Sequence, residues 1–172
     1  MAAPETVGPP SDGQKRRLSV LVVEDDFGDY DAAARALRKM VQYDATSIRA
    51  KTLEAARRAM VDQRFDVFLV DMNLGAESGS RFLSEAGGRS SSALPIALTG
   101  LLTEAAHDLA LRSGAIACIA KKDLSPTLLE TTIRSAFHTQ RVEAEYRRLV
   151  SEMSGLVCTY RQAAARSERL AS

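Results

Sequence analysis

The sequence predicts an α/β domain in which a parallel β-sheet is covered by helices on both faces. Short apolar runs, which are typical of strands, alternate with segments that carry apolar residues at helical spacing. The runs are almost wholly apolar, as expected for strands whose two faces are both buried. At 172 residues the chain is long enough for one well-buried domain and additional elements.

Five strands and five helices are expected between Leu18 and about Gln140. The strands are predicted at 18–23, 45–50, 67–71, 95–98 and 116–120. The helices are predicted at 31–41, 52–63, 80–86 and 103–113, with a fifth from Pro126 onward. Thr52 is expected to cap the second helix, and Pro126 suits a first helical turn. Residues 1–17 contain three prolines and two glycines without apolar periodicity, which predicts a disordered tail.

Residues 141–172 are predicted to form a helical extension of the domain at 18–140. Apolar residues recur there at alternating steps of three and four, the spacing of a heptad seam. The seam consists of Tyr146, Leu149, Met153, Leu156, Tyr160 and Ala163. Two arrangements are compatible with it. Either the helix packs back on its own domain, or residues 126–172 join two chains as a homodimer.

The charge balance excludes several classes of partner. The chain has 23 Lys and Arg and 22 Asp and Glu residues, so its net charge is only +1. This balance gives no sign of binding to nucleic acid or to an anionic membrane. The apolar stretches are shorter than the roughly 18 residues of a membrane-spanning helix, and the start of the chain lacks the features of a secretory signal. A cytoplasmic location is expected.

Polar residues that suit phosphoryl chemistry stand at the ends of four predicted strands. They are Glu24, Asp25, Asp71, Thr99 and Lys121. Because ligands bind at the carboxyl ends of parallel strands, these side chains are expected to meet in one crevice. Lys121 would pair with a phosphoryl oxygen and Thr99 would donate its hydroxyl to another. Gly100 would leave room for the phosphate.

The carboxylates of this group predict a nucleophile and a metal site. A carboxylate such as Asp71 can attack phosphorus and become an acyl phosphate. Several carboxylates close together repel one another unless a cation lies among them, and Mg²⁺ prefers oxygen ligands. Asp25, Asp71 and a main-chain carbonyl near Asn73 are the candidate ligands. Glu24 is expected to act through a bound water.

Residues 18 to about 138 resemble a receiver domain, the phospho-accepting module of two-component response regulators. The motif is carried by Glu24-Asp25, Asp71, Thr99 and Lys121, and Gly79 matches the family's glycine in the loop after the acceptor. The run Ala-Lys-Lys-Asp-Leu-Ser-Pro at 120–126 resembles a subgroup in which Leu-Ser-Pro follows the lysine, which favours Lys121 over Lys122. The resemblance implies a flavodoxin-like sheet with the strand order 2-1-3-4-5.

The resemblance also implies a function. The protein would accept a phosphoryl group on Asp71 from a sensor histidine kinase or a phosphotransfer protein, in a Mg²⁺-dependent reaction. It would catalyse this transfer and its own dephosphorylation rather than a metabolic reaction. Residues 141–172 are too short for a DNA-binding output domain. Signalling through protein–protein contacts, including phosphorelay, is therefore expected.

The sequence departs from the usual receiver pattern at several positions. Receivers commonly carry an aromatic switch residue in the last strand, where this chain has Cys118. Gly75 stands where a proline is common, which is expected to loosen the loop after the acceptor. Asp26 and Asp29 add acidity and are expected to face solvent at a helix N-terminus.

Two other functions are compatible with parts of this pattern. One is a phosphate-independent interaction module with a receiver fold. Cys118 at the position of the usual aromatic switch residue is compatible with this alternative. The other is a Mg²⁺-dependent phosphohydrolase that uses an aspartyl phosphate. In the haloacid-dehalogenase-like hydrolases, however, the nucleophile ends the first strand, whereas Asp71 ends the third predicted strand. The chain also has no cap insertion that could bind a substrate.

Overall fold

The computed structural model describes residues 15–75, 77–88 and 93–170, with side chains described up to Ser154. The chain divides into two compact units, Met1–Arg134 and Ser135–Ser172. The division falls inside one long helix, α5 (Pro126–Leu170), and before the predicted domain boundary at residue 140.

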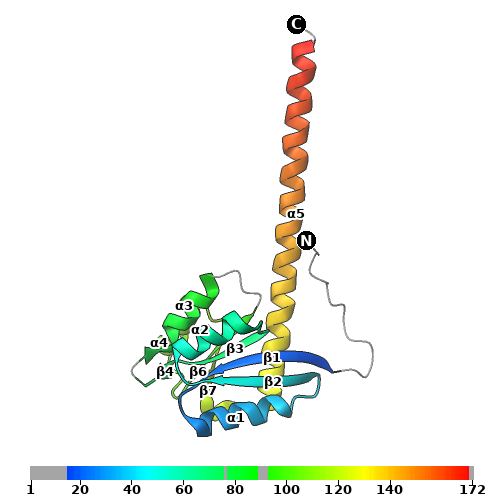
Figure 1. Ribbon diagram of the computed structural model, residues 1–172. Coiled ribbons are helices and arrows are strands. Elements are labelled where there is room, and N and C mark those ends of the chain that lie inside the picture. Colours follow the sequence, from blue (N-terminus) through cyan, green and yellow to red (C-terminus); the bar gives the residue numbers. More distant parts are fainter. Residues whose placement is uncertain (1–14, 76, 89–92, 171–172) are drawn as a thin grey trace. The chain divides into compact units, whose positions relative to one another are not determined.

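The first unit is built on a five-stranded parallel sheet with the order β2-β1-β3-β6-β7 (Figure 1). Its strands are β1 (Arg16–Val23), β2 (Tyr43–Ala50), β3 (Val67–Asp71), β6 (Leu94–Thr99) and β7 (Ala117–Ala120). This confirms the predicted sheet and its order 2-1-3-4-5. Arg16 and Arg17 belong to β1, although both were expected in the N-terminal tail. Residues 1–14 of that tail lie outside the described residues.

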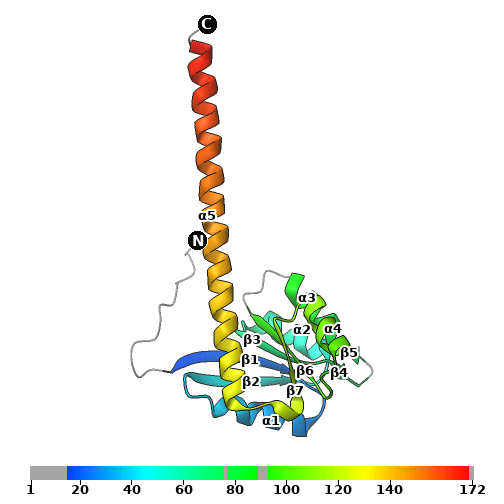
Figure 2. The ribbon, with the colours of Figure 1, turned by 180° about the vertical axis from the view of Figure 1, so that it is seen from behind.

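Helices cover both faces of the sheet. They are α1 (Phe27–Arg38), α2 (Leu53–Asp62), α3 (Gly79–Gly88), α4 (Glu104–Arg112) and the start of α5. Figures 1 and 2 show α2 and α3 on one side of the sheet, and α1 with the first turns of α5 on the other. Leu129 and Ile133 anchor these first turns, because both are fully buried.

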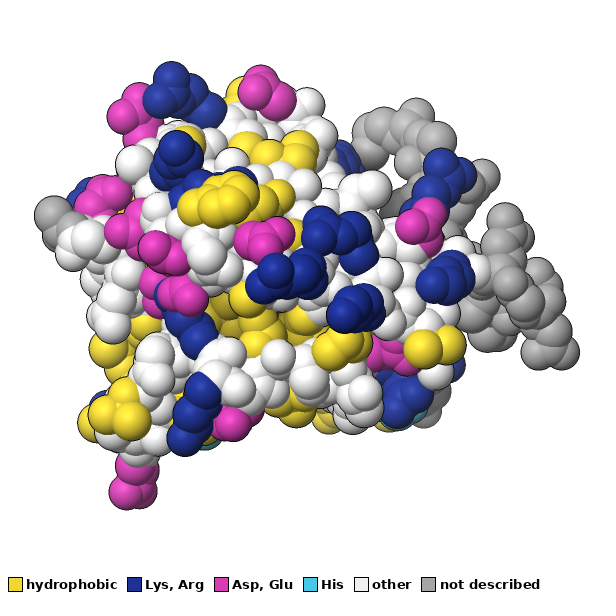
Figure 3. Space-filling view, turned by 90° about the horizontal axis from the view of Figure 1, so that it is seen from below, with side chains coloured by type: hydrophobic (Ala, Val, Ile, Leu, Met, Phe, Trp, Pro, Cys, Tyr) yellow, Lys and Arg dark blue, Asp and Glu magenta, His cyan; other side chains and the backbone are white. Residues whose placement is uncertain are grey.

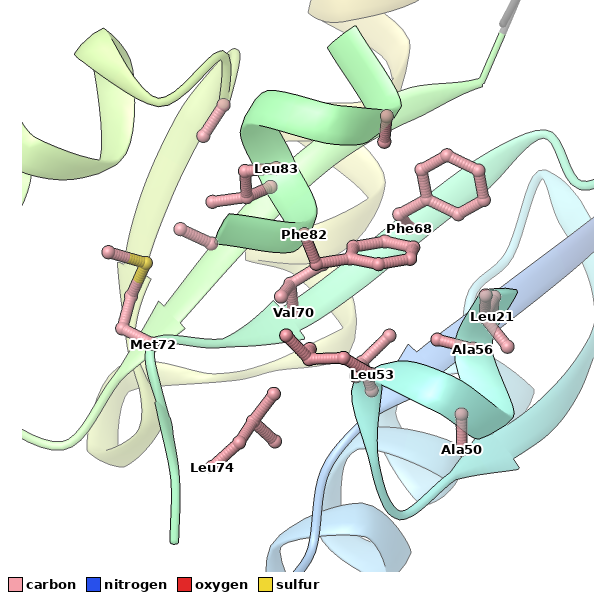
Figure 4. Close-up of a cluster of buried hydrophobic side chains, with 14 of the residues drawn as sticks. Leu21, Ala50, Leu53, Ala56, Phe68, Val70, Met72, Leu74, Phe82 and Leu83 are labelled. Carbon is pink, nitrogen blue, oxygen red and sulfur yellow. The ribbon is translucent and has the colours of Figure 1, made fainter. Parts of the chain in front are cut away.

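The core beneath α2 and α3 is aromatic at its centre. Phe68 of β3 meets Phe82 of α3 edge to face, with their ring centroids 5.5 Å apart (Figure 4). Leu53 and Ala56 of α2 and Leu83 of α3 complete the packing against the sheet. Because this core holds the sheet and the two helices together, it fixes where the carboxyl ends of the strands lie.

Helix α1 begins earlier than the apolar pattern predicts, at Phe27 rather than at residue 31. The cause is a side-chain cap. The backbone N–H of Asp29 donates to Asp26 Oδ1 at 2.9 Å, which satisfies a donor at the helix start. The cap brings the first turn of α1 next to the acidic residues that follow β1.

Short elements that were not predicted lie after two of the core strands. β4 (Asn73–Leu74) and β5 (Glu77–Ser78) form a small antiparallel pair after β3. Gly75 lies in the turn between them with a φ of 53°, a backbone conformation that glycine adopts without strain. A 3-10 helix, η1 (Lys121–Asp123), follows β7.

The second unit consists of the remainder of α5. From residue 142 to residue 153 its large apolar side chains are exposed, namely Val142, Tyr146, Leu149, Val150 and Met153, whereas Phe137 is partly buried. The predicted seam residues Leu156, Tyr160 and Ala163 lie in the helix, but their side chains are outside the described part. Among the described residues, no helix is both long and apolar enough to cross a membrane.

Candidate functional site

The carboxyl ends of β1, β3 and β7 bring three of the predicted site residues into direct contact. The ammonium nitrogen of Lys121 lies 2.8 Å from Asp71 Oδ2 and 2.7 Å from Glu24 Oε2. Parallel pairing aligns the strands so that Val23 faces Val70 and Thr99 faces Ala120, and the residues that follow therefore leave the sheet at the same edge. Lys121 and Asp71 meet here although they are 50 positions apart in the sequence.

The ammonium of Lys121 is surrounded by carboxylates. A third one, from Asp29, lies 2.6 Å away, and the lysine side chain is only 18% exposed. Burial by itself lowers the pKa of Lys121. The hydrogen bonds to Asp29 and Asp71, together with the close carboxylate of Glu24, outweigh burial and raise its pKa above the usual value for lysine. The site therefore holds a permanent positive charge beside Asp71.

Glu24 is almost completely buried, with 1% of its surface exposed. Its Oε1 accepts a hydrogen bond of 3.1 Å from the backbone N–H of Asp26. Its Oε2 is near Lys121 but makes no well-directed hydrogen bond. Burial raises the pKa of Glu24, and the pull of the Lys121 ammonium only partly offsets this effect. A buried carboxylate oxygen with free lone pairs suits a cation or its bound water.

Glu24, Asp25 and Asp71 meet the geometric requirement for a shared cation. Each offers one oxygen, and the three oxygens lie within 4.8 Å of one another. Hard oxygen ligands from carboxylates are the donor set that Mg²⁺ prefers. The residues present therefore fit Mg²⁺. At Asn73 the structure gives a different contact from the predicted carbonyl ligand, because its backbone N–H donates to Asp71 Oδ1 at 3.1 Å. A metal contact by the Asn73 carbonyl stays a prediction.

Asp29 is a site residue that sequence reasoning missed. It was expected to face solvent, and the structure corrects this, since its half-exposed carboxylate contacts Lys121. The early start of α1 explains the difference, because it places Asp29 in a helical turn beside the end of β1. The only sequence signal was the acidic run itself, which did not indicate the contact.

Arg49, near the end of β2, is a second residue near the site that was not predicted from the sequence. Its guanidinium donates to the backbone carbonyls of Glu24, at 3.0 Å, and of Asp25. It also lies over the rings of Phe27 and Tyr30, 5.5 Å from each centroid. These contacts hold the backbone of the acidic pair against β2. No sequence signal marked Arg49, because a basic residue in an edge strand is usually solvated.

Thr99 and Gly100 lie at the end of β6 as predicted. The buried Thr99 hydroxyl donates to the backbone carbonyl of Leu101 at 3.1 Å. A Cβ on Gly100 would have no neighbouring atom within 4 Å, so the space beside it is open. The hydroxyl contact with a phosphoryl group that was predicted for Thr99 stays a prediction.

Cys118 of β7 is partly buried, and burial raises the pKa of its thiol.

Gly79 fixes the backbone that carries Asp71. Its N–H donates to the carbonyl of Met72 at 3.1 Å. A Cβ at this position would lie 2.0 Å from the carbonyl oxygen of Asp71, closer than real Cβ atoms approach such an atom. The first residue of α3 must therefore lack a side chain for the helix to pack against the end of β3.

Charged side chains of both signs lie on the face of the molecule shown in Figure 3. Several Asp and Glu side chains gather toward the left of this face, and a group of Lys and Arg side chains lies near its centre and right. The small net charge of the chain therefore does not mean that charged side chains are scarce on this face.

Several solved structures are similar to this chain. A CheY-like receiver domain protein from Methanospirillum hungatei is 24% identical, with a TM-score of 0.61 over 76% of this chain and 99% of its own. The receiver domain of a DNA-binding response regulator from Colwellia psychrerythraea is 26% identical, with a TM-score of 0.61 over 70% of this chain and 98% of its own.

A response regulator from Burkholderia pseudomallei was solved with a phosphorylated aspartic acid and a calcium ion. It is 23% identical, with a TM-score of 0.55 over 76% of this chain and 86% of its own. No curated protein sequence is significantly similar to the chain. Residues 20–134 match the family described as the response regulator receiver domain. The chain therefore belongs to the receiver domain family of two-component response regulators.

Proposed function

We propose that this protein is a response regulator that accepts a phosphoryl group on Asp71. The observation that carries the proposal is the environment of Asp71. Its carboxylate is buried, lies 2.8 Å from the Lys121 ammonium and is grouped with Glu24 and Asp25. Phosphoryl transfer requires a positioned nucleophile and neutralisation of charge, and this arrangement offers both.

The donor would be the phosphohistidine of a sensor histidine kinase or a phosphotransfer protein. An Asp71 oxygen forms the new bond to phosphorus while the N–P bond of the donor breaks, and the bonding electron pair stays on the imidazole nitrogen. Lys121 then pairs with one phosphoryl oxygen. Thr99 donates its hydroxyl to another after leaving the Leu101 carbonyl. Later attack of water on phosphorus returns the Asp71 carboxylate and releases inorganic phosphate.

Mg²⁺ is the cofactor that this site would hold. Asp25, Asp71 and the main-chain carbonyl of Asn73 would ligate it directly, and Glu24 would do so through water. When bound, Mg²⁺ supplies charge neutralisation for the phosphoryl oxygens. The orphaned Glu24 oxygen and the close carboxylates support this assignment.

Phosphorylation by acetyl phosphate tests the proposal directly. With Mg²⁺ the wild-type protein is expected to gain a phosphoryl group, which a phosphate-affinity gel and intact mass would detect. Asp71→Asn should abolish it, because the nucleophile is lost, and a chelator should suppress it. Asp62→Asn, which changes an exposed residue of α2, is the matched control and should behave as wild type. Absence of phosphorylation with acetyl phosphate and with histidine kinases would favour a phosphate-independent interaction module.

We also propose that residues 18–140 act as the receiver, and that α5 joins two chains as a homodimer through residues 126–172. The exposed apolar side chains of the second unit support this proposal. Tyr146, Leu149 and Met153 follow heptad steps, and Val142 continues the pattern toward the receiver. A stripe of this kind is stable in water only when another apolar surface covers it. Signalling would then proceed through protein–protein contacts.

Light scattering after size exclusion tests the homodimer. Met153 is 66% exposed on the stripe, so Met153→Arg should weaken self-association on the order of ten-fold while the receiver stays folded. Ser151→Arg places the same side chain on the other side of the helix and should leave the dimer intact. A monomeric wild type would instead support a helix that packs back on its own chain. Adding beryllofluoride, a phosphoryl mimic, would show whether phosphorylation shifts the equilibrium.

A further inference from the structure

We infer that Asp29 competes with the incoming phosphoryl group for the ammonium of Lys121 and so limits phosphorylation of Asp71. This inference rests on the proposed function of Asp71 as phosphoacceptor. Of the three carboxylates around Lys121, that of Asp29 is the nearest, at 2.6 Å, compared with 2.7 Å for Glu24 and 2.8 Å for Asp71. The contact joins the first turn of α1 to the residue that follows β7.

Carboxylate oxygens already lie close around the ammonium. It donates hydrogen bonds to Asp29 at 2.6 Å and to Asp71 at 2.8 Å, and Glu24 Oε2 lies 2.7 Å away without a well-directed hydrogen bond. A phosphoryl oxygen that pairs with Lys121 therefore competes with carboxylates that already contact it. Which of these carboxylates is displaced depends on how each is held.

Asp29 is the carboxylate that can leave at the smallest cost. Glu24 and Asp71 are buried, so neither can turn to water. The Asp29 side chain is 46% exposed, and water can replace the ammonium as its partner. Asp29 also lies outside the group of carboxylates that could share a cation. Consequently, Asp29 would contact the Lys121 ammonium in the unphosphorylated protein, and a phosphoryl oxygen would replace it after phosphorylation.

Electrostatic repulsion adds to this competition. Two anions that share one ammonium lie roughly 4–5 Å apart, a distance at which like charges near a protein surface repel appreciably. A charged Asp29 therefore opposes the negatively charged phosphoryl group even after it has released Lys121. Removing the charge but keeping the shape should strengthen phosphoryl binding on the order of ten-fold.

The substitution Asp29→Asn tests the inference, with Asp31→Asn as its matched control. Both remove one negative charge from α1, but Asp31 pairs with Arg35, at 2.8 Å, rather than with Lys121. Beryllofluoride would be titrated at fixed Mg²⁺ and followed by ¹⁹F NMR, and the phosphorylated fraction would be measured with acetyl phosphate. For Asp29→Asn, the concentration of each reagent at half-saturation is expected to fall about ten-fold. Asp31→Asn should match wild type.

A gain in binding cannot arise from a damaged fold, which separates this role from a merely structural one. If Asp29→Asn proved unstable in thermal unfolding, Asp29→Ser would replace it, with the same expectation. Equal or weaker binding by these variants, with a responsive wild type, would overturn the inference and leave the proposed function standing. A wild type that takes up neither reagent would overturn the proposed function, and the inference with it.

Discussion

Replacing Lys121 by methionine is expected to destabilise the fold by about 3 kcal/mol in the absence of divalent cations. The ammonium is the shared partner of Glu24, Asp29 and Asp71, and the first and last of these are buried. Without it, buried carboxylates face one another without a counterion. The value lies at the lower end of the usual range for breaking a buried ion pair, because Asp29 is half-exposed and can turn to water.

Mg²⁺ should rescue much of this loss. The ammonium and the metal would neutralise the same carboxylates, so the metal gains affinity when the lysine is absent. A ligand present at 100 times its dissociation constant stabilises a fold by about 2.7 kcal/mol. The increase in melting temperature on adding Mg²⁺ is therefore expected to be larger for Lys121→Met than for wild type.

Chemical denaturation with and without Mg²⁺ would measure both effects. Lys122→Met is the matched control, because it changes the neighbouring lysine, which is exposed. It should change stability by less than about 0.5 kcal/mol. If Lys121→Met were as stable as this control without metal, the ion pairs of Lys121 would contribute nothing to the fold.

Gly79→Ala is expected to destabilise the protein by about 3 kcal/mol. The added Cβ would lie 2.0 Å from the carbonyl oxygen of Asp71 and 3.0 Å from Val70 Cγ1. The first of these atoms belongs to the backbone, which cannot move aside as a flexible side chain can. The start of α3 would have to shift away from β3, and Asp71 would shift with it. Phosphorylation by acetyl phosphate should fall together with stability.

Gly100→Ala provides the control for this prediction. A Cβ at Gly100 meets no atom within 4 Å, so the substitution should change stability by less than about 0.5 kcal/mol. Denaturant titration of both variants would give the comparison. Equal stability of the two variants would show that the backbone after β3 yields more easily than the packing around Gly79 suggests.

The sequence by itself determined the fold class and the order of its main elements. The apolar runs are short and almost uninterrupted, which is the pattern of strands buried on both faces, and β3 was predicted with its observed bounds, Val67–Asp71. It also determined which residues stand at the strand ends, because that depends only on local pattern. Glu24, Asp71, Thr99 and Lys121 could therefore be assigned to one edge of the sheet from their positions in the chain alone.

Only the tertiary structure decided which of these residues touch. Asp29 contacts Lys121 across 92 positions of the sequence, and Arg49 reaches the carbonyl of Glu24 across 25 positions. Both contacts depend on how α1 and β2 pack beside β1, and no periodic pattern encodes that packing. The close approach of Gly79 to Asp71 depends in the same way on the docking of α3. Local pattern fixes which elements form, whereas the distances that set the chemistry arise from packing between elements distant in sequence.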